Sequence, residues 1–418
     1  MEHLPAAPAA ATAVPRPPTV RFLDRRTPPH IATLILMAGL GALSLNIFLP
    51  SLPSMAAFFG VPYPSMQLSV SLYLAVTALV QIVIGPLSDR FGRRRVMLGA
   101  VAVFVVATLG ALLATTFPVF MACRMLQAAI AAGFVLSRAV VRDMVPQDQA
   151  ASMIGYVTMG MSVVPMVGPV VGGALDEAFG WQATFGLLAA GGAALLALVW
   201  ADQGETLAAR GGGFRAQLRD YPQLLRSQRF WGYCLAAAFA SGVFFAFLGG
   251  APYVGSAVFG MDPATLGFYF GAPAMGYLVG SGLSGRFAAR VGVNRMVMAG
   301  AVLTTAGMAA LLALTLGGLA GRNLFFGLVT TVGLGNGLLL PSANAGLLSV
   351  RPHLAGSAAG LGGALAIGGG AALSAVAGAI LTPGSGTVPL ILLMLATSGV
   401  SVLCILWVMA RERRLRRA

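Results

Sequence analysis

A short charged motif between two apolar runs holds the first residues that could do chemistry. It reads Gly85-Pro86-Leu87-Ser88-Asp89-Arg90-Phe91-Gly92-Arg93-Arg94-Arg95. A carboxylate at a helix end can interact with the positive N-terminus of another helix, so Asp89 could act as a conformational gate between two helices. We expect Gly85 and Gly92 to permit close packing and a tight turn. The alternative is that the charges only anchor a loop in water.

Arg124 is a charged residue well inside an apolar run that is long enough to cross a bilayer. Charges inside a membrane are costly and usually face a cavity or a partner. Gln127 follows one turn later, so the two side chains share a helix face and could form a polar site. Arg138 lies about four turns further on, on roughly the same face, and Asp143 lies near the end of that run. The alternative for Arg124 is a snorkelling side chain near one end of its span.

Several aromatic side chains within apolar runs are candidates for lining a cavity. The strongest candidates are Tyr73, Phe244, Phe247 and Tyr253. For each residue taken alone, a packed core or a lipid-facing position is the more common fate. As a set, they indicate an apolar and adaptable pocket that suits uncharged or amphipathic drug-like molecules.

Other kinds of chemistry are excluded. The chain contains no lysine, so it has no Gly-x-x-x-x-Gly-Lys nucleotide loop and ATP does not drive it directly. His3, His30 and His353 lie outside the apolar runs, which leaves no histidine proton relay inside a membrane. The three cysteines lie far apart and show neither disulfide nor metal spacing. We therefore expect no cofactor, no metal and no enzymatic activity.

Composition indicates that the elements positioning these residues are membrane helices. Of the 418 residues, 58% are hydrophobic and 9% are charged, too few charges to cover a soluble protein of this length. Apolar runs of about 20 residues, the length that a helix needs to span a bilayer, recur along the chain. They lie at 31–51, 68–87, 96–115, 118–140, 150–173, 183–200, 230–250, 264–285, 296–318, 323–346, 355–380 and 388–410. We expect an all-α integral membrane protein with twelve transmembrane helices.

The arginines predict the orientation of the chain. All 26 basic residues are arginine, and the formal net charge is +14. With both termini in the cytoplasm, every arginine except Arg124 and Arg322 falls on the cytoplasmic side, as the positive-inside rule requires. The basic charge then faces the anionic inner leaflet, so no nucleic-acid partner is needed to explain it. The expected partners are the lipid bilayer and a small substrate, and the expected oligomeric state is a monomer.

The chain divides into two halves of six runs each. The longest polar interruption lies between the sixth and seventh runs, and short segments around Asp89 and Gly285 resemble each other at equivalent positions. Two such halves related by a parallel repeat are typical of transporters that bind their substrate near the midplane. The expected divisions are a disordered cytoplasmic tail at 1–30, a half at 31–200, a cytoplasmic linker at 201–229, a half at 230–410 and a basic tail at 411–418.

A glycine-rich stretch marks the fifth run. It contains Gly168, Pro169, Gly172 and Gly173. Ordinary packing of small residues between membrane helices explains this pattern as well as a specific function does. The functional interpretation is that a Gly-Pro kink seals the interface between the halves against leakage.

These motifs, in this order and spacing, resemble those of the major facilitator superfamily. The match includes the charged motif around Asp89, Arg124-x-x-Gln127, and Gly168-Pro169-x-x-Gly172-Gly173, which resembles the signature of drug:proton antiporters. Further segments resemble the Bcr/CflA family of bacterial drug exporters, whose members confer resistance to bicyclomycin, chloramphenicol or florfenicol. They are Leu49-Pro50-Ser51-Leu52-Pro53, Arg138-Ala139-Val140-Val141-Arg142-Asp143 and Phe179-Gly180-Trp181.

The resemblance implies a proton-coupled exporter of antibiotics in a bacterial inner membrane. It implies that Asp89 locks the cytoplasmic side closed and that Arg124 belongs to a proton-coupling network. One departure concerns Asn46, which stands where the family usually carries an aspartate. Because an amide does not take up and release a proton near neutral pH, that route of coupling is absent here.

Two rival functions stay open from the sequence. One is an uncoupled facilitator or importer of a small metabolite, which the absence of deep carboxylates favours and the Gly168–Gly173 motif opposes. The other is a membrane sensor or scaffold that transports nothing, which the absence of an appended globular domain opposes.

Overall fold

The computed structural model describes residues 20–145, 147–207, 222–319, 321–351 and 355–417. Throughout this described part the regular structure is helical. Ten of its helical segments are long and apolar enough to cross a membrane. Two further helices, α7 (Gln147–Phe179) and α11 (Pro263–Val291), are equally long. The prediction of an all-α membrane protein is therefore confirmed.

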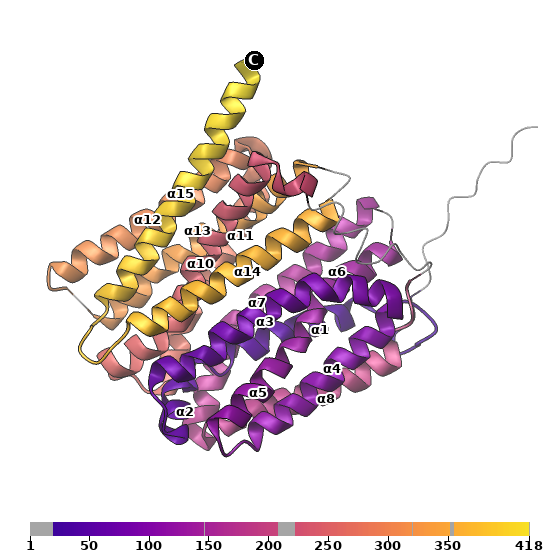
Figure 1. Ribbon diagram of the computed structural model, residues 1–418, viewed down its shortest axis with the longest axis horizontal. Helices are drawn as coiled ribbons and strands as arrows, with labels where there is room; N and C mark the ends of the chain where they lie inside the picture. Colours follow the sequence, from indigo (N-terminus) through magenta and orange to yellow (C-terminus); the bar gives the residue numbers. More distant parts are fainter. Residues whose placement is uncertain (1–19, 146, 208–221, 320, 352–354, 418) are drawn as a thin grey trace, which may run out of the picture.

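The helices form two groups that follow one another along the chain (Figure 1). Besides α7, the first group contains α1 Ile31–Asn46, α2 Leu52–Phe59, α3 Tyr63–Phe91, α4 Arg93–Leu112, α5 Phe117–Gln127, α6 Ala132–Met144 and α8 Gln182–Asp202. Besides α11, the second group contains α10 Gln228–Tyr253, α12 Val293–Leu316, α13 Arg322–Ser349, α14 Ala355–Ile380 and α15 Val388–Arg417. The two groups meet where α3 packs against α14 and where α7 packs against α11.

Three short segments of other helical geometry interrupt or end the long helices. A 3₁₀ turn over Leu49–Ser51 separates α1 from α2, because proline lacks the backbone N–H that a continuous helix needs. A second 3₁₀ turn, Ala128–Ala131, joins α5 to α6 directly after Gln127. A π-helical segment, Val254–Val258, ends α10.

The charged motif is continuous helix for most of its length and does not form a loop between two helices. Helix α3 runs through Pro86 to Phe91, and Gly92 is the one non-helical residue between α3 and α4. Gly92 has a φ of +95°, a conformation that only glycine adopts at low cost. Gly85 lies inside α3, and a Cβ there would meet no atom within 4 Å. The tight turn therefore depends on Gly92, and Gly85 contributes no close packing.

Most of the described arginines of both groups lie at one end of the helices, which we call the arginine-rich end; Arg124 and Arg322 lie elsewhere. It comprises the last turns of α3, α6 and α11 and the first turns of α4, α10 and α12, with Arg90, Arg93, Arg142, Arg229, Arg290 and Arg295. The other end of the same helices is called the opposite end. Gly292, with a φ of +91°, separates α11 from α12 as Gly92 separates α3 from α4. The two groups thus share the same turn at the same end.

Residues 20–30, expected to belong to a disordered tail, pack against the end of α8. The fully buried Asp202 carboxylate accepts hydrogen bonds from the Leu23 amide at 2.7 Å, the His30 amide at 2.8 Å and the Thr33 hydroxyl at 2.6 Å. A buried carboxylate is stable only when such donors satisfy it. The expectation is therefore wrong for residues 20–30, while residues 1–19 lie outside the described part.

The two other expected polar segments have different outcomes. Helix α15 continues to Arg417, so residues 411–417 of the expected basic tail at 411–418 extend that helix, and residue 418 lies outside the described part (Figure 1). Within the expected linker at 201–229, residues 203–207 turn back over the start of α4 through Glu205, and residues 208–221 lie outside the described part.

Candidate functional site

A buried cluster around Arg124 is the most polar feature inside the first group of helices. The Arg124 side chain is 0% exposed. Its Nη1 atom donates to Gln127 Oε1 at 2.8 Å and to Ser44 Oγ at 3.2 Å. Its Nη2 atom donates to the Ser44 carbonyl at 2.9 Å, and its Nε atom to the Ser69 carbonyl at 3.3 Å. The guanidinium thus joins α1, α3 and α5.

Aromatic faces complete the surroundings of this cation. The Arg124 guanidinium carbon lies 3.9 Å from the ring centroid of Tyr73 and 4.3 Å from that of Phe48. Cation–π contacts of this kind are strongest when they are desolvated. None of the ion pairs found among the described residues involves Arg124. Neutral oxygen atoms and aromatic rings therefore stabilise its charge.

The local structure explains why Arg124 and Gln127 meet. They lie in the last turn of α5, three residues apart on one face, where helical side chains are neighbours. Gln127 in turn donates from Nε2 to Thr108 Oγ1 on α4 at 2.8 Å. Spacing predicted this pair, but the acceptors Ser44 and Ser69 lie on other helices and carry no signal in the sequence.

Asn46 lies two residues beyond Ser44, on the side of α1 that faces α7. The residue is 3% exposed, and its Nδ2 atom donates to the Ala42 carbonyl at 2.7 Å. Its Oδ1 atom has no hydrogen-bond partner among the described residues. A Cβ at Gly168 would lie 3.6 Å from the Asn46 Cβ, in ordinary contact. The amide is therefore packed against the glycine-rich stretch of α7.

The glycines of α7 allow two backbones to touch. A Cβ at Gly172 would collide with the carbonyl oxygen of Ile47, the residue directly after α1. Gly173 faces the other group, because a Cβ there would collide with the Pro263 carbonyl at the start of α11. The contact is reciprocal, since a Cβ at Gly267 of α11 would collide with the carbonyl of Pro169. We call this contact between α7 and α11 the glycine seal.

Polar residues close the opposite end beside the glycine seal, and sequence reasoning missed them. Gln67 of α3 donates from Nε2 to the Ser374 carbonyl of α14 at 2.7 Å and to its hydroxyl at 2.8 Å. The Tyr63 hydroxyl donates to the Gly249 carbonyl of α10 at 2.9 Å, and the Tyr63 and Tyr253 rings pack at 5.2 Å. Both contacts join the two groups, so this structure is closed at the opposite end.

A second charge cluster lies at the arginine-rich end. The Arg93 guanidinium contacts Asp89 Oδ1 at 2.6 Å and Asp143 Oδ2 at 3.1 Å, and it also donates to the Ser88 hydroxyl. These contacts tie the end of α3 and the end of α6 to the start of α4. The residues that the sequence grouped with Arg124 therefore separate, because Asp143 belongs to this second cluster. Arg138 of α6 lies within electrostatic range of Arg142 and of Tyr277 on α11.

Glu205 is a member of this second cluster that the sequence did not reveal. Its Oε1 atom accepts from the Arg93 amide at 2.9 Å, and its Oε2 atom accepts from the Arg94 amide at 3.3 Å. A carboxylate at the start of a helix is favourable because it meets the unpaired amides and the positive end of the helix dipole. The Glu205 side chain occupies the space beside Gly92 that a Cβ would fill.

Asp89 and Arg90, the remaining gate residues, lie near the end of α3. Asp89 pairs with Arg93 of its own group, and Arg90 is exposed with its guanidinium 5.3 Å from the Phe91 ring. One helix N-terminus that could interact with Asp89, the start of α14, adjoins residues 352–354, which lie outside the described part. Asp89 as an inter-helix lock therefore stays a prediction.

The candidate cavity residues have different surroundings. Phe247 is 0% exposed and packs against Phe270 and Phe326 at 5.1 and 6.1 Å. In this structure it belongs to the packed core and lines no open cavity. Phe244 is half-buried beside it, Tyr73 covers Arg124, and Tyr253 packs against Tyr63 at the opposite end.

We predict that Gly92→Ala destabilises the protein and that Gly85→Ala does not. Alanine at residue 92 would adopt a backbone conformation reserved for glycine and displace Glu205, at a cost of about 1–3 kcal/mol. Thermal unfolding of the purified protein in detergent measures the difference. Equal unfolding temperatures for the two variants would contradict this account of the turn.

Comparison with known proteins gives similarity over most of the chain. Residues 34–375 match the family model described as Major Facilitator Superfamily. A chloramphenicol resistance protein from Pseudomonas aeruginosa is 31% identical over 335 residues, which cover 78% of each chain. A bicyclomycin resistance protein homolog from Haemophilus influenzae is 28% identical over 274 residues, 64% of this chain and 68% of that protein. The crystal structure of a peptide transporter has a TM-score of 0.73 at 13% identity, covering 94% and 97% of the two chains.

Proposed function

The chain belongs to the Major Facilitator Superfamily, and we propose that it exports small, apolar, drug-like compounds from the cytoplasm. Membership makes it a membrane transporter and not an enzyme. The observation that carries the proposal is the similarity to resistance proteins for chloramphenicol and bicyclomycin over about two thirds or more of each chain. Export lowers the drug concentration inside the cell, and this lower concentration makes the cell resistant.

We propose that α7 and α11 also cross the membrane, giving twelve spans in two six-helix halves. The halves are the two groups of helices, and the arginine-rich end faces the cytoplasm of a bacterial inner membrane. The arginine distribution supports this orientation, because positive loops are retained on the cytoplasmic side. Both termini are then cytoplasmic, and the opposite end faces outward.

Transport in this proposal requires the opposite end to open and close. The glycine seal and the Gln67–Ser374 contact hold it closed here. Releasing a substrate outward requires α7 to separate from α11 while the contacts within each half persist, as in rocking-type alternating access. The glycine-rich stretch supports this function because it lets two backbones meet without a side chain between them.

Drug susceptibility tests the proposed function directly. Expression in a bacterial host that lacks its own drug pumps should raise the inhibitory concentration of chloramphenicol, bicyclomycin or another small apolar antibiotic. The matched control is the same host with the Gly173→Ala variant at an equal level in the membrane. Unchanged susceptibility across a broad panel of such compounds would contradict drug export.

We further propose that the proton gradient drives export and that Asp176 binds the coupled proton. Asn46 cannot serve, because its amide does not titrate. Asp176 of α7 is 8% exposed, accepts from the Ser54 hydroxyl at 3.0 Å and lies three residues beyond Gly173. A largely buried carboxylate beside a moving contact can change its solvent access when the opposite end opens. Glu177, the next residue, is exposed.

The pair Asp176 and Glu177 provides a matched test of coupling. Asp176→Asn should make any remaining efflux insensitive to the proton gradient and reduce its rate by about tenfold, or roughly 1.4 kcal/mol. Glu177→Gln should leave efflux unchanged, because an exposed carboxylate is equally hydrated in both conformations. Efflux assays on energised cells measure both variants. Full gradient-driven efflux by Asp176→Asn would exclude this residue from coupling.

Uncoupled facilitated transport is the second candidate function, and Asn46 favours it. A facilitator needs no titratable group, and the buried position next to the glycine seal holds an amide instead of an acid. The two candidates differ in whether a substrate is moved against its concentration gradient.

A further inference from the structure

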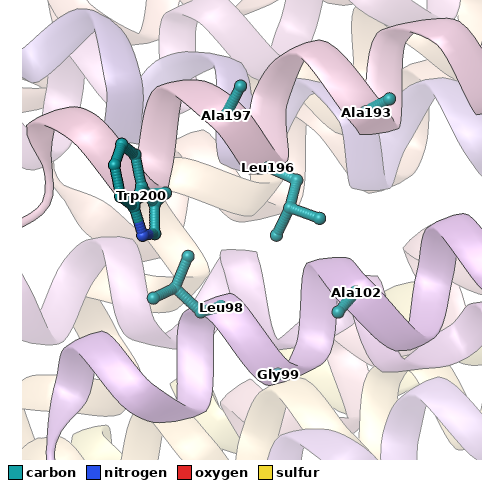
Figure 2. A pocket seen from close by; sticks show the side chains of 7 residues that line it. All are labelled: Leu98, Gly99, Ala102, Ala193, Leu196, Ala197 and Trp200. Carbon is teal, nitrogen blue, oxygen red and sulfur yellow. The ribbon is translucent and has the colours of Figure 1, made fainter.

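Two apolar hollows lie on the outer surface of the first group of helices, on either side of α4. The larger, of about 560 Å³, lies between α4 and α8 and is lined by Leu98, Leu196 and Trp200 together with small residues. Figure 2 shows Leu98 and Leu196 entering the space between the two helices from opposite sides, with Trp200 at one end. The smaller, of about 370 Å³, lies between α3 and α4. Both hollows are almost entirely apolar in their lining residues.

Gly99 separates the two hollows and lines both of them. The residue is exposed, and a Cβ there would meet no atom within 4 Å. The larger hollow is also lined by the short side chains of Ala102, Ala193 and Ala197, which leave it unfilled. The absence of long side chains along this face of α4 therefore creates two parallel grooves instead of a continuous packed surface.

The distance over which the hollows extend along α4, from the arginine-rich end toward the middle of the membrane, matches the thickness of one leaflet of a bilayer. Their lining on α4 extends from residue 96 to residue 103, and α4 begins at Arg93 in the arginine-rich end. At 1.5 Å per residue this places the deepest lining residue about 15 Å from the start of the helix. Half of the roughly 30 Å hydrocarbon core is the same distance. Lipid tails of a single leaflet therefore fit this depth.

Arginines lie at the shallow end of both hollows. Arg94 donates from Nη2 to the Trp200 carbonyl at 2.8 Å, and the Arg25 guanidinium lies 5.4 Å from the Trp200 ring. Arg90 lies over Phe91, which lines the smaller hollow, and Arg95 is exposed. None of these arginines forms an ion pair with a residue in the part of the chain that the structure describes.

The nearby carboxylates are already engaged. Glu205 accepts from the amides of Arg93 and Arg94, and Asp202 accepts from residues 23, 30 and 33. Asp24 accepts from the Arg26 amide. The guanidinium groups at the mouths of the hollows therefore carry positive charge that no acidic side chain of the described residues neutralises through an ion pair.

We propose that this face binds one diacyl phospholipid with an anionic headgroup. Each hollow takes one acyl chain, Gly99 lies between the chains, and Arg25, Arg90, Arg94 and Arg95 surround the phosphate. Charge complementarity favours an anionic lipid, because each arginine near the headgroup attracts an anionic headgroup more strongly than a zwitterionic one. The bound lipid connects α3, α4 and α8 to the segment at residues 20–30. The proposal is independent of the transported substrate.

Native mass spectrometry of the full chain, purified in detergent, tests this site. Phosphatidylglycerol and phosphatidylcholine with identical acyl chains are added at equal concentrations. We expect one phosphatidylglycerol to be retained about fivefold more than phosphatidylcholine, the factor that corresponds to one arginine beside a headgroup with a net negative charge. Gly99→Leu should abolish the retained adduct, because it places a branched side chain between the two hollows, at a position where a Cβ would meet no atom within 4 Å.

Two control variants separate this site from general lipid adhesion. Gly327→Leu places the same side chain at another exposed helical glycine with open space around it, and it should leave the adduct unchanged. Arg94→Gln combined with Arg95→Gln should remove the preference for phosphatidylglycerol, while Arg286→Gln combined with Arg290→Gln on the second group should keep it. Equal retention of both lipids by the unmodified protein, or an adduct that survives Gly99→Leu, would overturn the proposal.

Discussion

Gly173→Ala is expected to stop transport while the protein stays folded and inserted. The added methyl group would collide with the Pro263 carbonyl at the start of α11. Because the obstacle is backbone and not a flexible side chain, the opposite end cannot close as it does here. The protein should therefore accumulate in an outward-open state, with efflux reduced at least about a hundredfold, as expected when a required contact is displaced by roughly 1 Å.

Reciprocal and control variants make this prediction specific. Gly267→Ala should give the same loss, since its Cβ would collide with the Pro169 carbonyl. Gly271→Ala, one turn further along α11, should be neutral because nothing lies within 4 Å of its Cβ. The measurements are drug efflux and the labelling of an Ala264→Cys residue by a membrane-impermeant thiol reagent. Normal efflux by Gly173→Ala would contradict the glycine seal. So would labelling of Ala264→Cys that is no higher with Gly173→Ala than without it.

Arg124→Lys is expected to have the second largest effect, although it preserves the charge. The guanidinium reaches Ser44, Ser69 and Gln127 through three separate nitrogen atoms. A lysine carries its donors on one atom and cannot satisfy acceptors on three helices at once. Leaving buried acceptors unpaired costs about 1–3 kcal/mol for each. We expect a lower unfolding temperature and at least about tenfold slower efflux, from about 1.4 kcal/mol of lost positioning.

Arg322→Lys is the matched control for this prediction. Arg322 begins α13 and is exposed, so the same substitution there should change neither stability nor efflux. Both quantities can be measured on protein from the same membranes. Unchanged efflux by Arg124→Lys would show that the cluster only fills space between α1, α3 and α5.

The sequence predicted contacts within a helix better than contacts between helices. Arg124 and Gln127 are three residues apart, and helical spacing alone brings them together. Ser44 and Ser69 complete the same cluster from helices whose sequences give no sign of it, because a backbone carbonyl acceptor is present at every residue. Glu205 lies 112 residues from its partner Arg93, and only the three-dimensional arrangement joins them.

The charged motif shows the same limit in another form. Its two glycines look equivalent in sequence, yet Gly92 has a positive φ while Gly85 lies in regular helix with open space around it. The difference follows from where α3 ends, and helix ends are set by tertiary contacts such as those of Glu205. Residues 20–30 were mispredicted for a related reason, since a buried Asp202 supplies their partners from the end of α8.

Efflux measured before and after collapse of the proton gradient shows whether the proton gradient drives drug export. Cells of a pump-deficient host that express the protein are loaded with chloramphenicol or a fluorescent drug-like dye, and export is followed with and without a protonophore. We expect export against a concentration gradient, and we expect it to stop when the protonophore is added. Export that continues unchanged after the proton gradient has collapsed would contradict proton-driven drug export.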